Sequence, residues 1–233
     1  DYLLPKQDLG QIVAEPALAF LLTHGAKIHL ETRVSHLNHH IDDRIKINGE
    51  VFDAVILAVA PYHVDALLPE DTPDYIQTAY QSLSYHAITT VYLRYAQAVK
   101  LPAPLTGFSD GTAQWVLHRG ALGLPDNEVA VVISVSDCTE AWKDKDLAEK
   151  AHEDIKRICP DLGKPEAVRI ITEKRATTAA TVDFVQPDFS WLHHRRIYPA
   201  GDYLHPRYPA TLEAAVQSGF AAAEKLMLDL QVE

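Results

Sequence analysis

The chain has 233 residues, 47% of them apolar, enough for one large domain or two modest domains with hydrophobic cores. Its 21 basic and 32 acidic residues give a formal charge of -11, which argues against a nucleic-acid partner because such binding needs clustered lysine and arginine. Neither Cys138 nor Cys159 belongs to a CxxC pair, and no apolar stretch suits a membrane span or a secretory signal, so we expect reduced cysteines and a cytoplasmic protein.

The first third of the chain mixes helical and strand-like patterns. Apolar spacing predicts a helix ended by Gly25, then an alternating strand, then a hairpin through Asn48-Gly49. An apolar run follows, which is typical of a strand buried on both faces, and two short helices come after it. In chain order these elements are expected at residues 14–24, 27–37, 45–47 with the strand after the hairpin, 54–60, 64–68 and 73–81.

The middle of the chain predicts a sheet with one amphipathic helix, and the end predicts a strand followed by a long helix. Strands are expected at 87–95, 114–118, 129–135, 168–172 and 197–200, helices at 144–158 and 209–228, and irregular chain at 96–113 and 177–194. The apolar face of the last helix is expected to contain Leu212, Ala215, Val216, Phe220, Ala223 and Leu226. This order predicts a mixed α/β fold in which a sheet domain interrupts an α/β unit.

The segment from Tyr198 to Gly219 has a pattern suited to ligand chemistry. A strand ends at Gly201-Asp202, and a helix is expected to begin at Pro209, whose missing N–H is tolerated in a first turn. Free N–H groups at a helix start favour negative charge, such as that of a reduced flavin at its N1–C2=O edge. Gly201 would allow a close approach of the backbone, and Asp202 could accept hydrogen bonds from ribityl hydroxyls. For Gly-Asp alone, a plain strand-end turn is the simpler interpretation.

The whole string from Gly201-Asp202 through residues 208–219 resembles the C-terminal flavin motif of the flavin amine oxidase and phytoene desaturase superfamily. Weaker strings, Glu173 to Thr177 and Gln114-Trp115 with Arg119-Gly120, resemble the squalene-associated FAD-dependent desaturases, or hydroxysqualene dehydroxylases. The likeness spans essentially the entire chain. It also includes the opening residues 3–26 and residues 52–59.

The resemblance implies part of an FAD-binding Rossmann-like domain interrupted by a mixed-sheet substrate domain. It assigns residues 1–63 and 185–233 to the FAD-binding part and residues 64–184 to the substrate-binding part. It implies FAD as cofactor. The cofactor-binding residues it suggests are Val34, Ala58, Val59, Gly201, Asp202, Tyr208, Pro209, Ala210, Thr211 and Leu212. Taken without the resemblance, Val34, Ala58 and Val59 are equally well read as core residues.

The sequence also departs from the family pattern. Tyr203 stands where the family often has tryptophan, Ala214 where it often has glycine, and Gln217 where it often has arginine. The chain has no G-x-G-x-x-G and does not start with methionine, so we expect a C-terminal fragment that lacks the dinucleotide-binding part and is inactive alone.

Three functions are compatible with these residues. The first is an FAD-dependent oxidoreductase that acts on a long isoprenoid, such as hydroxysqualene or a related squalene or carotenoid precursor, bound in an apolar tunnel of the middle block. The alternatives are a flavin amine oxidase and a non-enzymatic prenyl-binding escort protein. The sequence names no catalytic residue and no oligomeric state.

The histidines and the basic cluster at 193–196 are further candidate sites. The adjacent pairs His39-His40 and His193-His194 cannot easily hold one ion, so no metal is expected. Arg195-Arg196 beside His193-His194 reads as a solvated loop, with a contact to a lipid head group or a diphosphate as the alternative. A peripheral membrane association is therefore left open.

Overall fold

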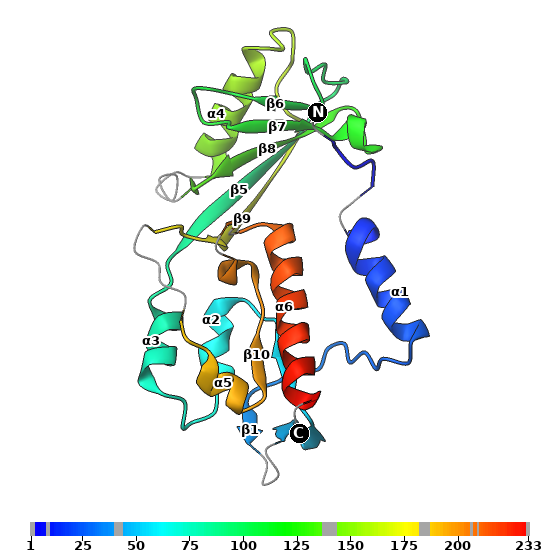
Figure 1. Cartoon of the computed structure of the whole chain (residues 1–233). Helices are drawn as coiled ribbons and strands as arrows, with labels where there is room; N and C mark the ends of the chain where they lie inside the picture. Colours follow the sequence, from blue (N-terminus) through cyan, green and yellow to red (C-terminus); the bar gives the residue numbers. More distant parts are fainter. Residues whose placement is uncertain are drawn as a thin grey trace. The chain divides into compact units, whose positions relative to one another are not determined.

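The computed structural model describes residues 3–7, 10–39, 44–136, 144–181, 187–205, 207–208 and 210–231. The chain forms two compact units (Figure 1). The first unit comprises Asp1–Leu30 and His86–Ala176, and the second comprises Glu31–Tyr85 and Thr177–Glu233. None of the helices within the described ranges combines the length and apolarity needed to cross a bilayer.

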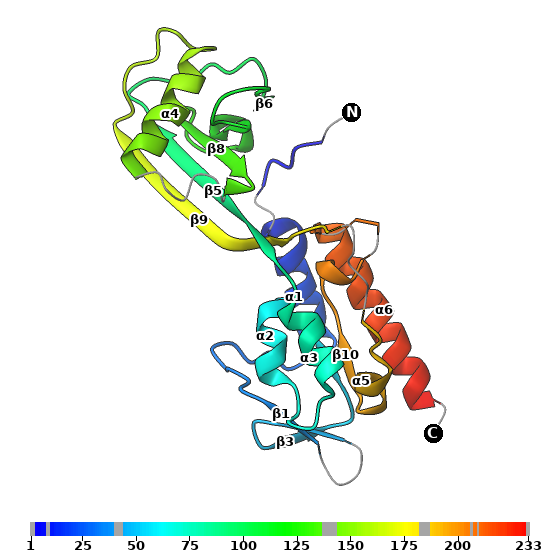
Figure 2. The same ribbon diagram turned by 90° about the vertical axis from the view of Figure 1, so that its left-hand side faces the viewer.

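A five-stranded sheet with strand order β6-β7-β8-β5-β9 dominates the first unit. Its strands are β5 (Tyr85–Arg94), β6 (Leu105–Gly107), β7 (Trp115–His118), β8 (Glu128–Ser134) and β9 (Ala167–Thr178), and a short 3-10 helix, η3 (Arg119–Leu122), follows β7. Helix α4 (Asp144–Lys156) covers one face of this sheet (Figure 2). Alternate strand residues face the helix because successive side chains of a strand point to opposite faces. The core between them contains Val91, Leu93, Val116, Val129, Val131, Ile133, Leu147, Ala151 and Ile155.

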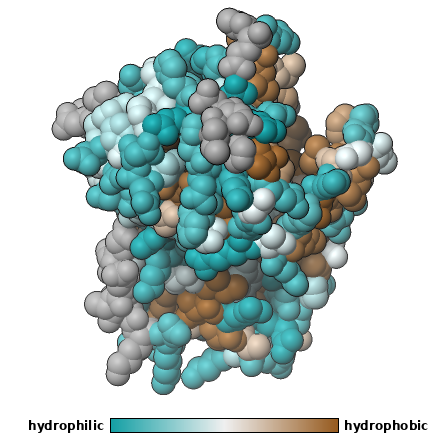
Figure 3. Space-filling model, turned by 90° about the horizontal axis from the view of Figure 1, so that it is seen from below, coloured by the Kyte–Doolittle hydropathy of each residue, from teal (hydrophilic) through white to brown (hydrophobic). Residues whose placement is uncertain are grey.

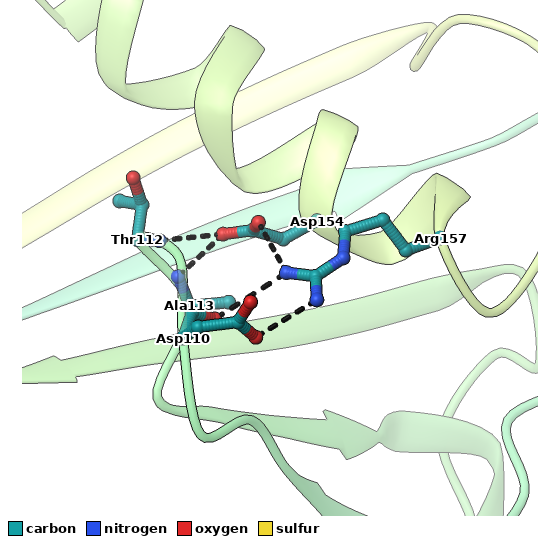
Figure 4. A network of polar contacts seen from close by, with 5 residues as sticks. All are labelled: Asp110, Thr112, Ala113, Asp154 and Arg157. Carbon is teal, nitrogen blue, oxygen red and sulfur yellow. Dashed lines mark hydrogen bonds and ion pairs between the residues drawn. The ribbon is translucent and has the colours of Figure 1, made fainter.

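A buried carboxylate joins α4 to the loop between β6 and β7. Asp154 is only 7% exposed and accepts hydrogen bonds from the backbone N–H groups of Thr112 and Ala113 at 2.7 and 2.8 Å (Figure 4). Arg157 approaches the same carboxylate at 3.5 Å and pairs with Asp110 at 2.8 Å. Charge-assisted bonds therefore hold the loop, in addition to the packing of Phe108 and Ala113 against the core.

Helix α1 (Glu15–Thr23) confirms the first predicted helix, and a π-helical turn, η1 (Gly10–Ala14), precedes it. None of its residues is buried, and Phe20 is 61% exposed. A view of the molecule from below shows apolar side chains at the surface (Figure 3). A helix that is apolar on most sides is normally covered, so α1 is expected to contact further protein or ligand.

The second unit is built on two parallel strands, β4 (Val55–Leu57) and β10 (Ile197–Pro199). A small antiparallel sheet, β1 (Leu37–His39), β2 (Ile45–Ile47) and β3 (Glu50–Phe52), lies in the same unit. Its helical elements are α2 (Pro61–Val64), η2 (Asp65–Leu67), α3 (Asp74–Gln81), α5 (Ser190–His194), η5 (Asp202–Leu204) and α6 (Leu212–Gln231).

The parallel pair is packed on both sides within this unit. One core cluster joins Leu57 and Ile197 to α2, α3 and α5. On the other side, Tyr198 and Ala200 pack against Ala222 of α6. The last helix therefore lies directly against the strand pair (Figure 1).

The mixed fold expected from the sequence is confirmed, but several elements differ. The strand expected at 27–37 is wrong except at Leu37, because no neighbouring strand pairs with 27–36 within the described residues. Strand β4 is shorter than 54–60 and is not buried on both faces, since Ile56 is 38% exposed. Strand β6 and helix α5 fall in stretches expected to be irregular.

Candidate cofactor site

The carboxyl ends of β4 and β10 bring two predicted parts of the site together. The strands are parallel, and the N–H of Ala200 donates to the carbonyl of Leu57 at 3.1 Å. Ala58 and Val59 therefore leave the pair at the same edge as Gly201 and Asp202. The carboxyl edge of parallel strands is where open α/β sheets bind ligands.

Gly201 is required by its neighbour Tyr203. The backbone of Gly201 is extended, so left-handed geometry is not the reason for glycine. A Cβ at this position would lie 2.7 Å from Cδ1 of the Tyr203 ring. The N–H of Gly201 donates to Oγ of Ser218 on α6 at 2.9 Å. The glycine thus allows the turn to fold over a buried ring and to be tied to the helix.

Tyr203 itself belongs to the core. Its side chain is 5% exposed, and its hydroxyl donates to that of Tyr80 at 3.4 Å. Burial raises the pKa of Tyr203 far above its ordinary value, and burial also raises the pKa of Tyr80 to about 12. The aromatic residue after Gly-Asp is therefore a neutral packing residue in this chain.

Asp202 begins the short helix η5 directly after the strand edge. It is half-buried, and no hydrogen bond or ion pair of its carboxylate is found among the residues that the structure describes. Its backbone carbonyl accepts from the N–H of His205 at 3.3 Å. The carboxylate is thus placed at the strand edge with acceptor capacity to spare.

Helix α6 begins three residues later than expected, at Leu212. Thr211 is its N-cap, because the hydroxyl of Thr211 accepts the N–H of Ala214 at 3.1 Å. The N–H groups of Leu212 and Glu213 lie in the first turn and have no acceptor within the helix. Pro209, expected as the first helical residue, lies outside the described residues.

Ala210 precedes this cap in the left-handed region, with φ of 58°. That conformation is uncommon for a residue other than glycine and costs about 1 kcal/mol or more. The hydroxyl of Thr211 also donates to the carbonyl of Tyr208 at 2.7 Å, which closes the turn. Tyr208 is 48% exposed. Left-handed backbone at a residue other than glycine occurs at ligand sites as well as in plain turns such as that of Asn48.

Val34 lies in irregular chain rather than in the expected strand. It is partly buried and packs against the same core cluster as Val59. The structure places both residues in the second unit, but it supports only their packing role.

The sequence pattern described as flavin containing amine oxidoreductase matches residues 9–227. The chain belongs to this family. It is 29% identical over 240 residues to a hydroxysqualene dehydroxylase of Rhodopseudomonas palustris, covering 97% of this chain and 52% of that protein. It is 24% identical to the hydroxysqualene dehydroxylase of Zymomonas mobilis, covering 93% of this chain and 51% of that protein. The chain thus spans about half the length of these relatives.

Two solved structures share the fold of this flavin oxidoreductase chain. One, named as a candidate protoporphyrinogen oxidase of Exiguobacterium, has a TM-score of 0.65 and 20% identity, and the match covers 93% of this chain and 51% of that protein. The other, a putrescine oxidase redesigned in its cofactor binding, has a TM-score of 0.62 and 13% identity over 92% of this chain and 53% of that protein.

The residues at this edge fit the flavin that the family implies. A flavin presents hydroxyl donors and an edge that becomes negative on reduction. The edge of β4 and β10 offers the complementary groups, namely the carboxylate of Asp202 and the first-turn N–H groups of α6 that have no acceptor within the helix.

Three residues that sequence reasoning did not select organise this loop. Ser218 binds Gly201, and His205 and Gln217 bind each other at 2.7 Å. Ser218 and Gln217 lie in the motif that carried the resemblance, but only their contacts reveal a role. His205 had no signal in the sequence beyond its place between Asp202 and Tyr208.

The basic cluster at 193–196 does not act as one group. Arg195 pairs with Asp71 at 2.6 Å and stacks on Trp191. Arg196 instead lines a cavity of about 210 Å³ with His193, His194, Tyr198, Lys225, Asp229 and Leu230.

Proposed function

We propose that the chain is the C-terminal part of an FAD-dependent oxidoreductase that acts on a long isoprenoid, either hydroxysqualene or a related squalene or carotenoid precursor. The observation that carries the proposal is the edge formed by β4, β10 and the start of α6, within a member of the flavin oxidoreductase family. The hydroxysqualene dehydroxylase relatives support this substrate class.

The chain's own residues would have distinct tasks. A bound flavin supplies the hydride transfer. Asp202 would accept hydrogen bonds from the hydroxyls of the cofactor. The first-turn N–H groups of Leu212 and Glu213 would face the edge of the ring that becomes negative. Ala58 and Val59 would border the cofactor from the neighbouring strand.

The face of the first unit's sheet that is turned away from α4 carries side chains that suit an apolar substrate. Cross-strand pairs place Trp115 and Leu117 beside Val132 and Ala130, on the face turned away from α4. Trp115 is 47% exposed, and its ring lies over Gly107, where a Cβ would come within 2.9 Å. Burying such a face against a hydrocarbon would stabilise binding by about 25 cal/mol for each Å² covered.

The test uses a polypeptide of the relatives' length that contains this chain. We expect the purified protein to be yellow and Asp202→Ala to lower flavin occupancy without unfolding it. Asp53→Ala is the matched control, because Asp53 is an exposed aspartate at the opposite end of β4. Equal flavin content in both variants would refute the assignment of Asp202.

Substrate class is tested by product analysis with reduced and oxidised flavin. Conversion of hydroxysqualene supports the proposal, whereas turnover of amines alone would favour a flavin amine oxidase. A colourless protein that binds prenyl chains would favour an escort protein. Sedimentation with liposomes would test the peripheral membrane contact and, with it, a cytoplasmic but membrane-associated location.

A further inference from the structure

Between Asp202 and α6, His205 holds the described residues that follow it, Arg207 and Tyr208. The backbone N–H groups of Arg207 and Tyr208 both donate to Nδ1 of His205, at 3.2 and 3.0 Å. The imidazole also stacks on the Tyr208 ring, with centroids 5.4 Å apart and planes 17° apart. One side chain therefore fixes both the backbone and the aromatic residue of the loop.

The chemical form of His205 follows from its partners. Nδ1 receives two N–H donors, so it must be the unprotonated nitrogen. Nε2 then carries the hydrogen and donates to Oε1 of Gln217 at 2.7 Å. The amide nitrogen of Gln217 in turn donates to the carboxylate of Glu213. Because a carboxylate only accepts, the direction of every bond in this series is set.

This series connects the loop to the helix whose start faces the candidate site. Glu213 is in the first turn of α6, and Gln217 lies one turn later. The loop that His205 holds leads through the left-handed Ala210 to the cap at Thr211. Loss of the Nδ1 acceptor would free the backbone at Tyr208. The orientation of the first-turn N–H groups of α6 would then no longer be fixed from this side.

We propose that His205, through Gln217 and Glu213, is a positioning residue of the cofactor site, which holds Arg207 and Tyr208 in the conformation that binds flavin. The inference rests on the proposed flavin site and adds a residue to it. It also gives a role to Gln217, which stands where the family often has arginine. An arginine could not accept the Nε2 hydrogen, so in this chain His205 and Gln217 form an interdependent pair.

Two conservative substitutions distinguish the role of Nδ1 from that of Nε2. In His205→Asn the side-chain oxygen can take the place of Nδ1 and still accept the two N–H groups. In His205→Gln the amide reaches toward Gln217, but the Nδ1 acceptor is lost. His194→Ala is the control, because Nδ1 of His194 lies 2.6 Å from the carbonyl of Ser190, so that histidine is a donor elsewhere in the same unit.

The first measurement is amide exchange of Tyr208 in this chain. We expect exchange to become about tenfold faster in His205→Gln and His205→Ala, the factor that corresponds to about 1.4 kcal/mol, and to stay near wild type in His205→Asn and His194→Ala. The second is flavin affinity in a polypeptide of the relatives' length. There we expect the same order of variants, with about tenfold weaker binding when the Nδ1 acceptor is lost.

The outcomes separate this inference from the proposed function. Flavin held equally by all variants would overturn the role of His205 and leave the flavin site intact. Failure of His205→Asn to restore binding would also overturn it, since the acceptor would then not be what matters. A wild-type polypeptide that binds no flavin would overturn the proposed function and this inference together.

Discussion

Removing the buried carboxylate of Asp154 should destabilise the first unit more than any loss of a surface charge. Asp154→Ala leaves the N–H groups of Thr112 and Ala113 without their acceptor, and Ala113 is only 1% exposed. An unsatisfied donor costs about 1–3 kcal/mol when it is buried, as at Ala113, and less when it is half-buried, as at Thr112, so the two together should cost about 2–5 kcal/mol. Asp154→Asn keeps an acceptor of the same shape without its charge, so we expect this variant to lose about 1–2 kcal/mol of stability.

The assay is amide exchange of Val131 in the central strand β8, which reports opening of the sheet rather than of the loop. A loss of about 3 kcal/mol would speed this exchange about a hundredfold. Asp110→Asn is the control, because Asp110 pairs with the same Arg157 but its side chain is 68% exposed. Such a surface pair contributes about 1 kcal/mol or less. If Asp154→Ala changed exchange no more than Asp110→Asn, the two backbone bonds would not hold the unit together.

Three further changes test individual contacts. Gly201→Ala should destabilise the second unit by about 1–3 kcal/mol through overpacking against Tyr203, and Tyr203→Leu in the same chain should recover part of that loss in urea unfolding; purely additive effects would contradict the clash. Thr211→Ala should cost about 1 kcal/mol and speed exchange of the Ala214 amide, while Thr211→Ser should not. Burial lowers the pKa of His152, so as pH falls below the ordinary value of 6.5 the unfolded chain takes up the proton first and stability is lost. His152→Gln should therefore make the melting temperature fall less between about pH 7 and pH 5. The same dependence of melting temperature on pH in both proteins would count against a neutral, partly buried imidazole.

The elements that the sequence predicts well are those specified by local chemistry. Asn48 and Gly49 predict a hairpin because both tolerate positive φ, and the structure has 49° and 94° at these positions. Helix α3 is expected from its periodicity and is found at Asp74–Gln81. Such features need no information about the rest of the chain.

The elements that the sequence misses depend on partners distant in the chain. Strand β6 lies in a stretch rich in proline and glycine, and it exists because Leu105–Gly107 pairs with β7. The alternation at 27–36 predicts a strand, but within the described residues it has no neighbour to pair with. The predicted start of α6 at Pro209 is wrong because proline is common in a first turn, whereas here the helix begins at Leu212 and Thr211 makes the capping hydrogen bond.

The candidate site shows the same division. Gly201-Asp202 and the helix after it can be predicted from the sequence, because the motif consists of residues that are close together in the chain. The pair of His205 and Gln217 could not be predicted, since twelve residues separate them and each side chain is common on a surface. Only the turn that folds His205 back onto α6 brings them together.

Helix α6 shows why residue size, and not hydrophobicity alone, determines which face is buried. The sequence favours the large side chains of Leu212, Val216 and Phe220 for the core, yet they are 63%, 46% and 67% exposed. The helix instead packs against the strand pair through Ala222, and Ala214 on the same face is also buried. Small side chains allow the close approach that lets Ser218, on the same face, reach the N–H of Gly201.

The large apolar stripe is left on the opposite face and begins at Leu212, the first residue of α6. Because residues spaced by four lie along one side of a helix, Leu212, Val216 and Phe220 form one continuous surface. One face of α6 is thus used to fix the Gly-Asp turn, which leaves the other free to contact the cofactor or further protein. A substitution such as Val216→Asp should therefore leave the packing of the strand pair intact. It should weaken the binding of the cofactor or protein segment that covers the opposite face.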